Sequence, residues 1–169
     1  MIAHGARTHT VCEWTGLHPD HVRSLYKSYT SEGATGQGPR RRGPSPHQVA
    51  RYLKTGQDRS EAAAMIGLCM TLEVLPEVPL KNPRVELPCL WRGERLCKAY
   101  ELFRMIVPRP TMTFEQAVLL LIAVAEEAEI RVTRCKSCKA VMLSNPGGMG
   151  QGRCSPCGST SKSLAGLSA

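Results

Sequence analysis

The sequence has few aromatic residues and no long apolar stretch. Phe, Trp and Tyr make up 5% of its 169 residues. Much of the apolar content is Ala, Leu, Val and Met, which favours helices over a β-sandwich. The longest apolar run, residues 117–125, is far shorter than the roughly 20 residues that span a bilayer. The start, Met1 to Arg7, has no apolar segment of the kind found in secretory signals. We therefore expect a cytoplasmic, mostly helical protein with no membrane partner.

Acidic residues are also scarce relative to basic ones. The chain has 14 Asp and Glu residues against 22 Lys and Arg residues, which gives a formal net charge of +8. A positive excess is typical of proteins that bind an anionic partner, most commonly nucleic acid. Charge alone constrains function weakly, so a basic soluble protein without such a partner is the alternative interpretation.

The eight cysteines do not indicate a disulfide scaffold, because a chain without an export signal stays where thiols are kept reduced. Four of them form two Cys-x-x-Cys pairs, Cys135 with Cys138 and Cys154 with Cys157, and fifteen residues separate the pairs. Two pairs at this spacing are a strong signature of a zinc site. Four thiolates surround zinc at about 2.3 Å and leave no open position, so we expect a structural Zn²⁺ ion.

Several other features of the cysteines support this interpretation. Four cations beside them can offset the negative charge of a zinc tetrathiolate: Arg134, Lys136, Lys139 and Arg153. An iron–sulfur cluster is an alternative, since four cysteines suit it too. A thioredoxin-like redox site is not expected, because the chain lacks a β-α-β pattern. The remaining cysteines are expected to be buried structural thiols: Cys12, Cys69, Cys89 and Cys97. No Cys–His pair suggests a nucleophile, and we predict that the protein is not an enzyme.

Apolar periodicity and capping signals predict the helical body. One helix begins near Asp58, with Asp58 as N-cap and Glu61 three residues later. A second helix extends from about Leu90 to Val107. A third follows a capping box formed by Thr113 and Gln116 and continues to about Val132. Because this third helix is apolar nearly all round over residues 117–125, we expect it to be central and buried.

These patterns divide the chain into three parts. Residues 1–132 form a helical domain, with a helix-turn-helix at about 6–29, a Gly- and Pro-rich loop at 30–46 and further helices up to residue 132. Residues 133–158 form a zinc-binding module, and the small, polar residues 159–169 form a disordered tail. The expected fold class is therefore mostly α, with an N-terminal helix-turn-helix and a C-terminal four-cysteine zinc-binding module.

The helix-turn-helix prediction rests on the segment from Thr8 to Lys27. Gly16 lies where the turn needs a permissive backbone angle, and Pro19 suits the first turn of the second helix. The second helix would be the recognition helix, whose first residues reach base edges. Its outward side chains are the candidate DNA contacts: His18, Asp20, Arg23, Ser24 and Lys27. The alternative is an ordinary helical hairpin with a polar exterior.

A second candidate for DNA contact is the run Arg40, Arg41 and Arg42. In a loop rich in Gly and Pro, these side chains can move to meet phosphate groups. A solvated charge run is an equally good interpretation.

The order of these parts resembles the FlhC family of bacterial flagellar transcription activators. In the local sequence, Gly5-Ala6-Arg7 leads into the motif, Leu25-Tyr26-Lys27 closes it, and Lys98-Ala99-Tyr100 lies in the penultimate long helix. The resemblance covers about residues 5–158 and depends on the order and spacing of the motifs. The chain differs from the family at residues 40–44, where members carry an aromatic stretch, and before Gly5, where they have a longer helix.

The resemblance implies a cytoplasmic, DNA-binding transcription activator that forms a hetero-oligomer with an FlhD-like subunit on flagellar or related promoters. Promoter DNA and RNA polymerase are the further partners that it implies. It also implies a zinc ion held by Cys135, Cys138, Cys154 and Cys157, and no catalytic activity. The alternative function is a zinc-containing protein–protein adaptor without direct DNA contact.

Overall fold

The computed structural model describes residues 1–31, 46–76, 79–147 and 152–158. Within these ranges the chain is mostly helical, as the composition predicts. Two predicted features, the basic run Arg40 to Arg42 and the tail 159–169, lie outside the described residues.

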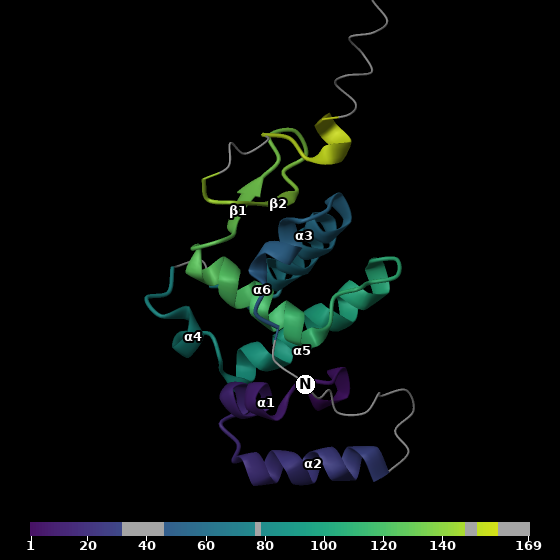
Figure 1. Ribbon diagram of the computed structural model, residues 1–169, viewed down its shortest axis with the longest axis vertical. Helices are drawn as coiled ribbons and strands as arrows, with labels where there is room; N and C mark the ends of the chain where they lie inside the picture. Colours follow the sequence, from purple (N-terminus) through teal and green to yellow (C-terminus); the bar gives the residue numbers. More distant parts are fainter. Residues whose placement is uncertain (32–45, 77–78, 148–151, 159–169) are drawn as a thin grey trace, which may run out of the picture.

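In the described part of the chain, three long helices form the body (Figure 1). They are α3 (Gly56–Thr71), α5 (Leu90–Ile106) and α6 (Phe114–Glu126). The predicted central position of α6 is confirmed, since Ala117, Leu120 and Leu121 are fully buried. Phe103 of α5 and Met65 of α3 are also fully buried in the same core. The core therefore lies where these three helices meet, as expected for helices whose apolar faces cannot be buried alone.

The beginning of α3 differs from the prediction. Asp58 is not the N-cap: Thr55 is, and its hydroxyl accepts a hydrogen bond from the Asp58 amide at 3.0 Å. The Asp58 carboxylate in turn accepts from the Thr55 amide at 3.1 Å, which completes a capping box. A short 3-10 helix η2, Val49–Leu53, precedes it. The connection after α3 contains a short helix α4, Pro83–Glu86.

The N-terminal part consists of η1, Ile2–His4, α1, Thr8–Thr15, and α2, Pro19–Ser31. The helix α1 ends at Gly16, whose φ of 72° lies in the left-handed region predicted for the turn. On α2, Val22 and Tyr26 face inward and are buried. The two predicted helices are therefore present, joined by the turn at 16–18, and we call them the N-terminal helical pair.

The end of α6 also differs from the prediction. The helix stops at Glu126, and Glu127 adopts a left-handed conformation with φ of 50°. Val132 does not belong to a helix, because it lies in the strand β1, Arg131–Arg134. This strand pairs antiparallel with β2, Val141–Ser144, in a register that places Val132 opposite Leu143. A β-hairpin therefore replaces the predicted last turns of α6.

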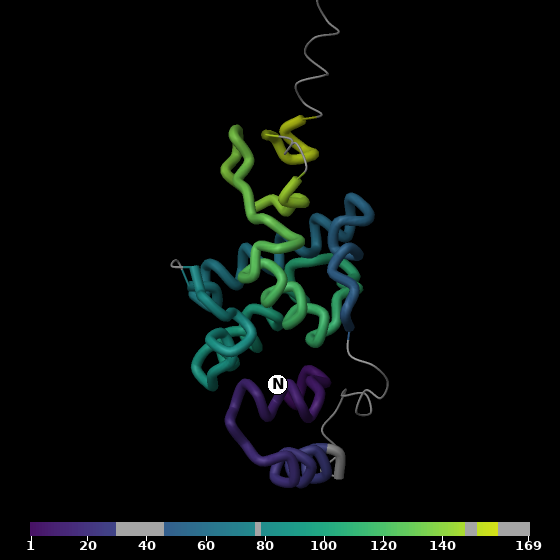
Figure 2. Tube along the Cα trace, turned by 60° about the vertical axis from the view of Figure 1, so that its left-hand side comes forward, coloured from purple at the N-terminus to yellow at the C-terminus, as the bar shows by residue number. Residues whose placement is uncertain are grey.

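The hairpin and the N-terminal helical pair lie at opposite ends of the long axis of the molecule (Figures 1 and 2). The helix α2 is at the lower end in both views, and β1 and β2 are near the upper end. Of the helices that the structure describes, none combines the length and apolarity that a membrane crossing requires.

Candidate functional site

The two Cys-x-x-Cys pairs converge on one point. The sulfur atoms of Cys135, Cys138, Cys154 and Cys157 all lie within 4.8 Å of one another. The Sγ atoms of Cys138 and Cys154 are 3.6 Å apart. Four sulfurs placed about 2.3 Å from a tetrahedral ion would be separated by about 3.8 Å. The cluster therefore has the dimensions of a four-coordinate metal site, and it could hold a metal ion. We call residues 131–158, which carry it, the Cys module.

Backbone hydrogen bonds shape both pairs in the same way. The Lys139 amide donates to the Cys135 carbonyl at 3.0 Å, and the Gly158 amide donates to the Cys154 carbonyl at 2.8 Å. Each bond closes a turn that directs both cysteines of a pair to the same side. A third bond, from the Lys136 amide to the Gly152 carbonyl at 2.8 Å, joins the two turns. The sulfurs therefore converge because the backbone around them is fixed.

Hydrogen bonds within the cluster shift the pKa values of two of its thiols in opposite directions. Amide groups, first that of Cys138 and then that of Cys154, lower the pKa of the buried Cys135 thiol to about 6. The Cys154 amide lies 3.3 Å from the Cys135 sulfur. Side-chain hydrogen bonding with Cys154, and then with Cys138, raises the pKa of Cys157 to about 12. The Cys135 thiol thus favours the thiolate form, and the Cys157 thiol keeps its proton. A bound metal cation would displace that proton.

The four cysteines would complete the coordination of a bound metal ion. Cys135 is buried, Cys154 and Cys157 are half-buried, and Cys138 is exposed. Four sulfurs fill a tetrahedral coordination shell and leave no position for a substrate. Within the described residues no histidine or carboxylate belongs to the cluster. This donor set suits a structural ion rather than a catalytic one.

The Cys module is packed against the body by the inner face of its hairpin. Leu143 and Ile130 are buried. The Val141 side chain lies against α3 at Gly67, where an added Cβ would be 3.8 Å from Val141 Cγ2. Burial of these apolar side chains adds a hydrophobic contribution that does not depend on a metal. The hairpin therefore positions the cysteines relative to the three long helices.

The other four cysteines take no part in this cluster. Cys69 is buried on α3, and burial raises the pKa of its thiol to about 12. Cys12, Cys89 and Cys97 are only half-buried. The expected buried position is therefore found for Cys69 alone among these four.

The candidate DNA contacts of the N-terminal helical pair share one side of α2 and the turn before it. All of them are exposed: His18, Asp20, Arg23, Ser24 and Lys27. Arg23 and Asp20 form an ion pair one turn apart, and the Asp20 amide donates to His18 Nδ1 at 3.3 Å. The carboxylate of Asp20 and the guanidinium of Arg23 therefore offset each other's charge on this side of α2. The two ends of the molecule that carry candidate site residues are thus α2 and the Cys module.

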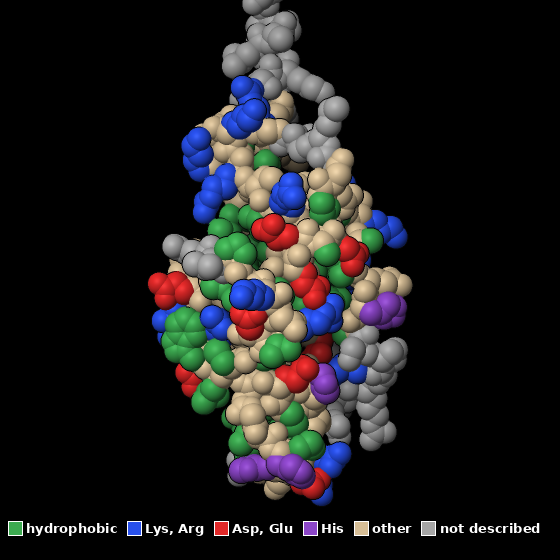
Figure 3. All heavy atoms as spheres, turned by 90° about the vertical axis from the view of Figure 1, so that its left-hand side faces the viewer, with side chains coloured by type: hydrophobic (Ala, Val, Ile, Leu, Met, Phe, Trp, Pro, Cys, Tyr) green, Lys and Arg blue, Asp and Glu red, His purple; other side chains and the backbone are tan. Residues whose placement is uncertain are grey.

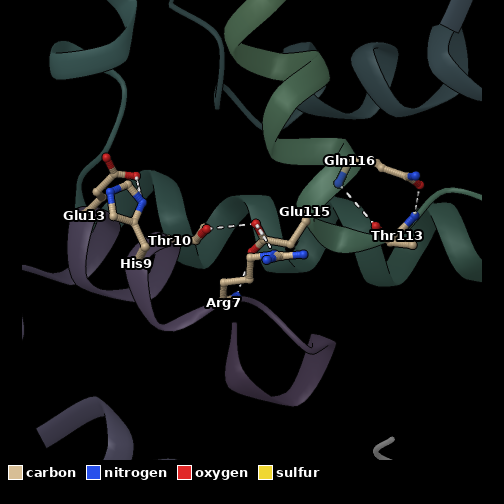
Figure 4. Close-up of polar contacts among 7 residues, drawn as sticks. All are labelled: Arg7, His9, Thr10, Glu13, Thr113, Glu115 and Gln116. Atoms are coloured by element: carbon tan, nitrogen blue, oxygen red, sulfur yellow. Dashed lines mark hydrogen bonds and ion pairs between the residues drawn. The ribbon is translucent and has the colours of Figure 1, made fainter. Parts of the chain in front are cut away.

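A buried carboxylate outside every sequence motif holds α1 in place. Glu115 of α6 is 7% exposed and points toward α1 (Figure 4). It accepts hydrogen bonds from the Arg7 amide at 2.7 Å and from the Thr10 hydroxyl at 3.0 Å. A negative charge at the first turn of α1 also opposes the positive end of the helix dipole. Glu115 therefore acts as an N-terminal cap supplied by another helix.

A second contact between α1 and the body lies at a glycine of α5. Trp14 of α1 is fully buried against Gly93 of α5. A Cβ at Gly93 would lie 3.5 Å from Trp14 Cε3, an ordinary contact distance, and 3.0 Å from Met1 Cε at the flexible end of that side chain. The backbone of α5 therefore lies directly against α1 at this position. Sequence reasoning missed both Glu115 and Gly93, since neither belongs to a motif and each acts only through a residue far away in the chain.

Comparison with known proteins does not assign the chain to a family. No protein-family model matches the chain, and no curated protein matches it significantly. The function of the chain therefore has to follow from its own residues.

Proposed function

We propose that the chain is a DNA-binding subunit of a cytoplasmic transcription activator, similar to FlhC, with a structural zinc ion in its Cys module. In this proposal it acts in a hetero-oligomer with an FlhD-like subunit on flagellar or related promoters, and it has no catalytic activity. The observation that carries the proposal is the exposed polar side of α2, combined with the +8 charge of the chain.

The chemistry of α2 fits contact with a duplex. Arg23 lies in the first half of α2, where a recognition helix reaches base edges, and its guanidinium can donate two hydrogen bonds to a guanine. Lys27, one turn later, suits a phosphate. Asp20 neutralises Arg23 in the free protein and can accept from a cytosine amino group on DNA. Glu115 and Trp14 fix α1, and through it α2, on the body.

The experiment that tests DNA binding is a titration of labelled promoter DNA with the wild-type chain and with Arg23→Ala. Loss of a base contact should weaken specific binding by about 1–3 kcal/mol and relax specificity at one base pair. Arg51→Ala is the matched control, because Arg51 is also exposed but lies on η2. If Arg23→Ala and Arg51→Ala bind as tightly as the wild type, α2 is not the reading surface.

Zinc is the metal that we propose for the Cys module. When bound, it would supply a closed, redox-inert cross-link between the two pairs. Elemental analysis of the purified protein, together with its visible absorption, tests this assignment. We expect one zinc per chain and a colourless protein. Iron with acid-labile sulfide would instead assign an iron–sulfur cluster.

A protein–protein adaptor without DNA contact is the second candidate function, and one observation favours it. The outer side of α5 exposes several large apolar side chains: Leu90, Trp91, Leu102, Met105 and Ile106. Met105 is the most exposed of them at 80%. Such a surface is typical of a site for another protein. Testing the chain alone and with an FlhD-like subunit on one DNA fragment separates the two functions, because an adaptor would bind the subunit and leave the DNA unbound.

A further inference from the structure

The Cys module carries charge of one sign. Between Arg131 and Gly158 the sequence contains no Asp or Glu, and Glu129 is the last acidic residue of the chain. The same stretch contains five cations: Arg131, Arg134, Lys136, Lys139 and Arg153. A zinc tetrathiolate would carry two negative charges and would therefore leave the module positive.

These five cations are exposed. In the described part of the chain none of them pairs with a carboxylate, whereas four arginines of the rest of the molecule do: Arg7, Arg23, Arg84 and Arg95. Lys and Arg side chains gather at the upper end of the molecule in Figure 3, and the carboxylates in that view lie lower. A group of cations without carboxylate partners on a small fold produces a local positive potential that attracts polyanions.

The amino-acid composition of the Cys module indicates which class of polyanion it would bind. Residues 131–158 contain no Phe, Trp or Tyr, and stacking on aromatic rings is the usual way to hold single-stranded nucleic acid. The described residues of the module also expose no large apolar side chain, which binding to a membrane surface would use. What remains is a set of long, flexible cations of the kind that contact the regularly spaced phosphates of a duplex.

We propose that the Cys module is a second DNA-contact surface, which binds the phosphate backbone of duplex DNA without reading its sequence. This inference rests on the proposed function and deepens it, because it assigns the two ends of the molecule different tasks. In this assignment α2 reads bases, and the Cys module supplies affinity that depends on salt. Because the two surfaces are at opposite ends of the molecule, changes at one should add to changes at the other.

The test replaces Arg131, Arg134 and Arg153 by Gln in the zinc-loaded, full-length protein. Lys136 and Lys139 stay, because their side chains contact the turns around the cysteines: the Lys139 ammonium donates to the Lys136 carbonyl at 3.3 Å, and the Lys136 side chain lies against Gly152. Two variants serve as controls. The first keeps charge at the same positions by Arg→Lys substitution. The second removes three exposed cations elsewhere: Lys54→Gln, Lys81→Gln and Arg104→Gln. Affinity for a labelled mixed-sequence duplex is measured at several salt concentrations.

We expect the Arg→Gln variant to bind the duplex roughly tenfold or more weakly at low salt. The slope of log affinity against log salt should become shallower by about 0.9 for each phosphate that the variant no longer touches. The Arg→Lys variant should keep the wild-type slope, and the distant control should change it little. Equal losses of affinity in the Arg→Gln variant and in the distant control would overturn the inference, since only bulk charge would then matter.

Other outcomes separate this inference from the proposed function. A wild-type protein that does not bind duplex DNA would sink both proposals. A wild type that binds, alongside an Arg→Gln variant that binds identically, would overturn the inference alone. Vesicles of phosphatidylserine and of phosphatidylcholine are tested in parallel. If the Arg→Gln substitutions abolish binding to the anionic vesicles and leave duplex binding unchanged, the surface belongs to a membrane and the inference is wrong.

Discussion

At the scale of single residues, the carboxylate of Glu115 is the clearest example of a side chain whose role depends on distant parts of the chain. It is buried, yet it is satisfied by the Arg7 amide and the Thr10 hydroxyl, which belong to the start of α1. Removing it would leave both donors inside the protein without this acceptor. A buried donor without a partner costs far more than an exposed ion pair contributes.

We predict that Glu115→Ala lowers the free energy of unfolding by about 2–3 kcal/mol. The control is Glu13→Ala on α1 itself (Figure 4), because the Glu13 side chain is 46% exposed and pairs with the exposed His9 side chain at 3.2 Å. Exposed pairs of this kind contribute about 0–1 kcal/mol. Chemical denaturation of both variants measures the difference. Similar midpoints for Glu115→Ala and Glu13→Ala would contradict the role given to Glu115.

The role of a residue could be predicted from the sequence where it depends on neighbours in the chain. It could not be predicted where it depends on residues that only the fold brings close. The spacing of the four cysteines predicts that they cluster, and the structure brings their sulfurs together. Gly16 indicates a tight turn because glycine adopts the left-handed conformation readily, and its φ of 72° confirms this prediction. Glu115 looks in the sequence like any surface glutamate at the start of a helix, because its partners lie about a hundred residues away.

At the scale of elements, the end of α6 shows why helix boundaries were only partly predictable. The start was correct, because Thr113 and Gln116 form the capping box that their spacing indicates. The sequence predicts an end near Val132, because apolar residues continue beyond Glu126 and no glycine interrupts them. Glu127 ends the helix in a conformation that a glutamate rarely adopts. The strands that follow have four residues each, which is too short for a clear period-2 pattern.

The left-handed conformation of Glu127 predicts that a substitution at this position can raise the stability of the protein. For a residue with a Cβ this conformation costs about 1–2 kcal/mol, and for glycine it does not. The greater freedom of glycine in the unfolded chain offsets part of that gain. We expect Glu127→Gly to stabilise the protein by about 0.5–1 kcal/mol, measured as a higher thermal midpoint.

Glu129→Gly is the matched control for this substitution. It removes the same charge two residues later at a position that is also exposed and has no positive φ. It should leave stability unchanged or lower it slightly. A lower midpoint for Glu127→Gly than for Glu129→Gly would show that strain at residue 127 does not limit stability.

At the scale of the whole molecule, the Cys module and the helical body depend on the proposed metal to different extents. The turns around the cysteines have little apolar material of their own and would rely on the ion. The hairpin beneath them is also held by Leu143 and Ile130, which are buried against the body. The helices α5 and α6 do not contribute to the cysteine cluster.

We therefore predict that removing the metal by chelation loosens part of the protein. Hydrogen exchange should become fast at amides of the two turns, such as Lys136 and Cys154, whose bonds join the pairs. Amides in the middle of α6 should stay protected. Restoring zinc in excess is the control and should recover the original pattern. Unchanged exchange in the turns, or uniform loss of protection across α6 as well, would contradict this division.

The bond between Glu115 and α1 also has a consequence for the order in which the protein folds. The two hydrogen bonds join residues 108 and 105 positions apart. During synthesis the N-terminal helical pair leaves the ribosome long before α6 does, and the loop that joins them must close before the bonds can form. The helix α1 thus lacks this anchor until α6 has been made, although Trp14 can already pack against α5. Contacts of such long sequence separation slow folding, so we expect the surface proposed to read DNA to be fixed on the body only after most of the chain has been made.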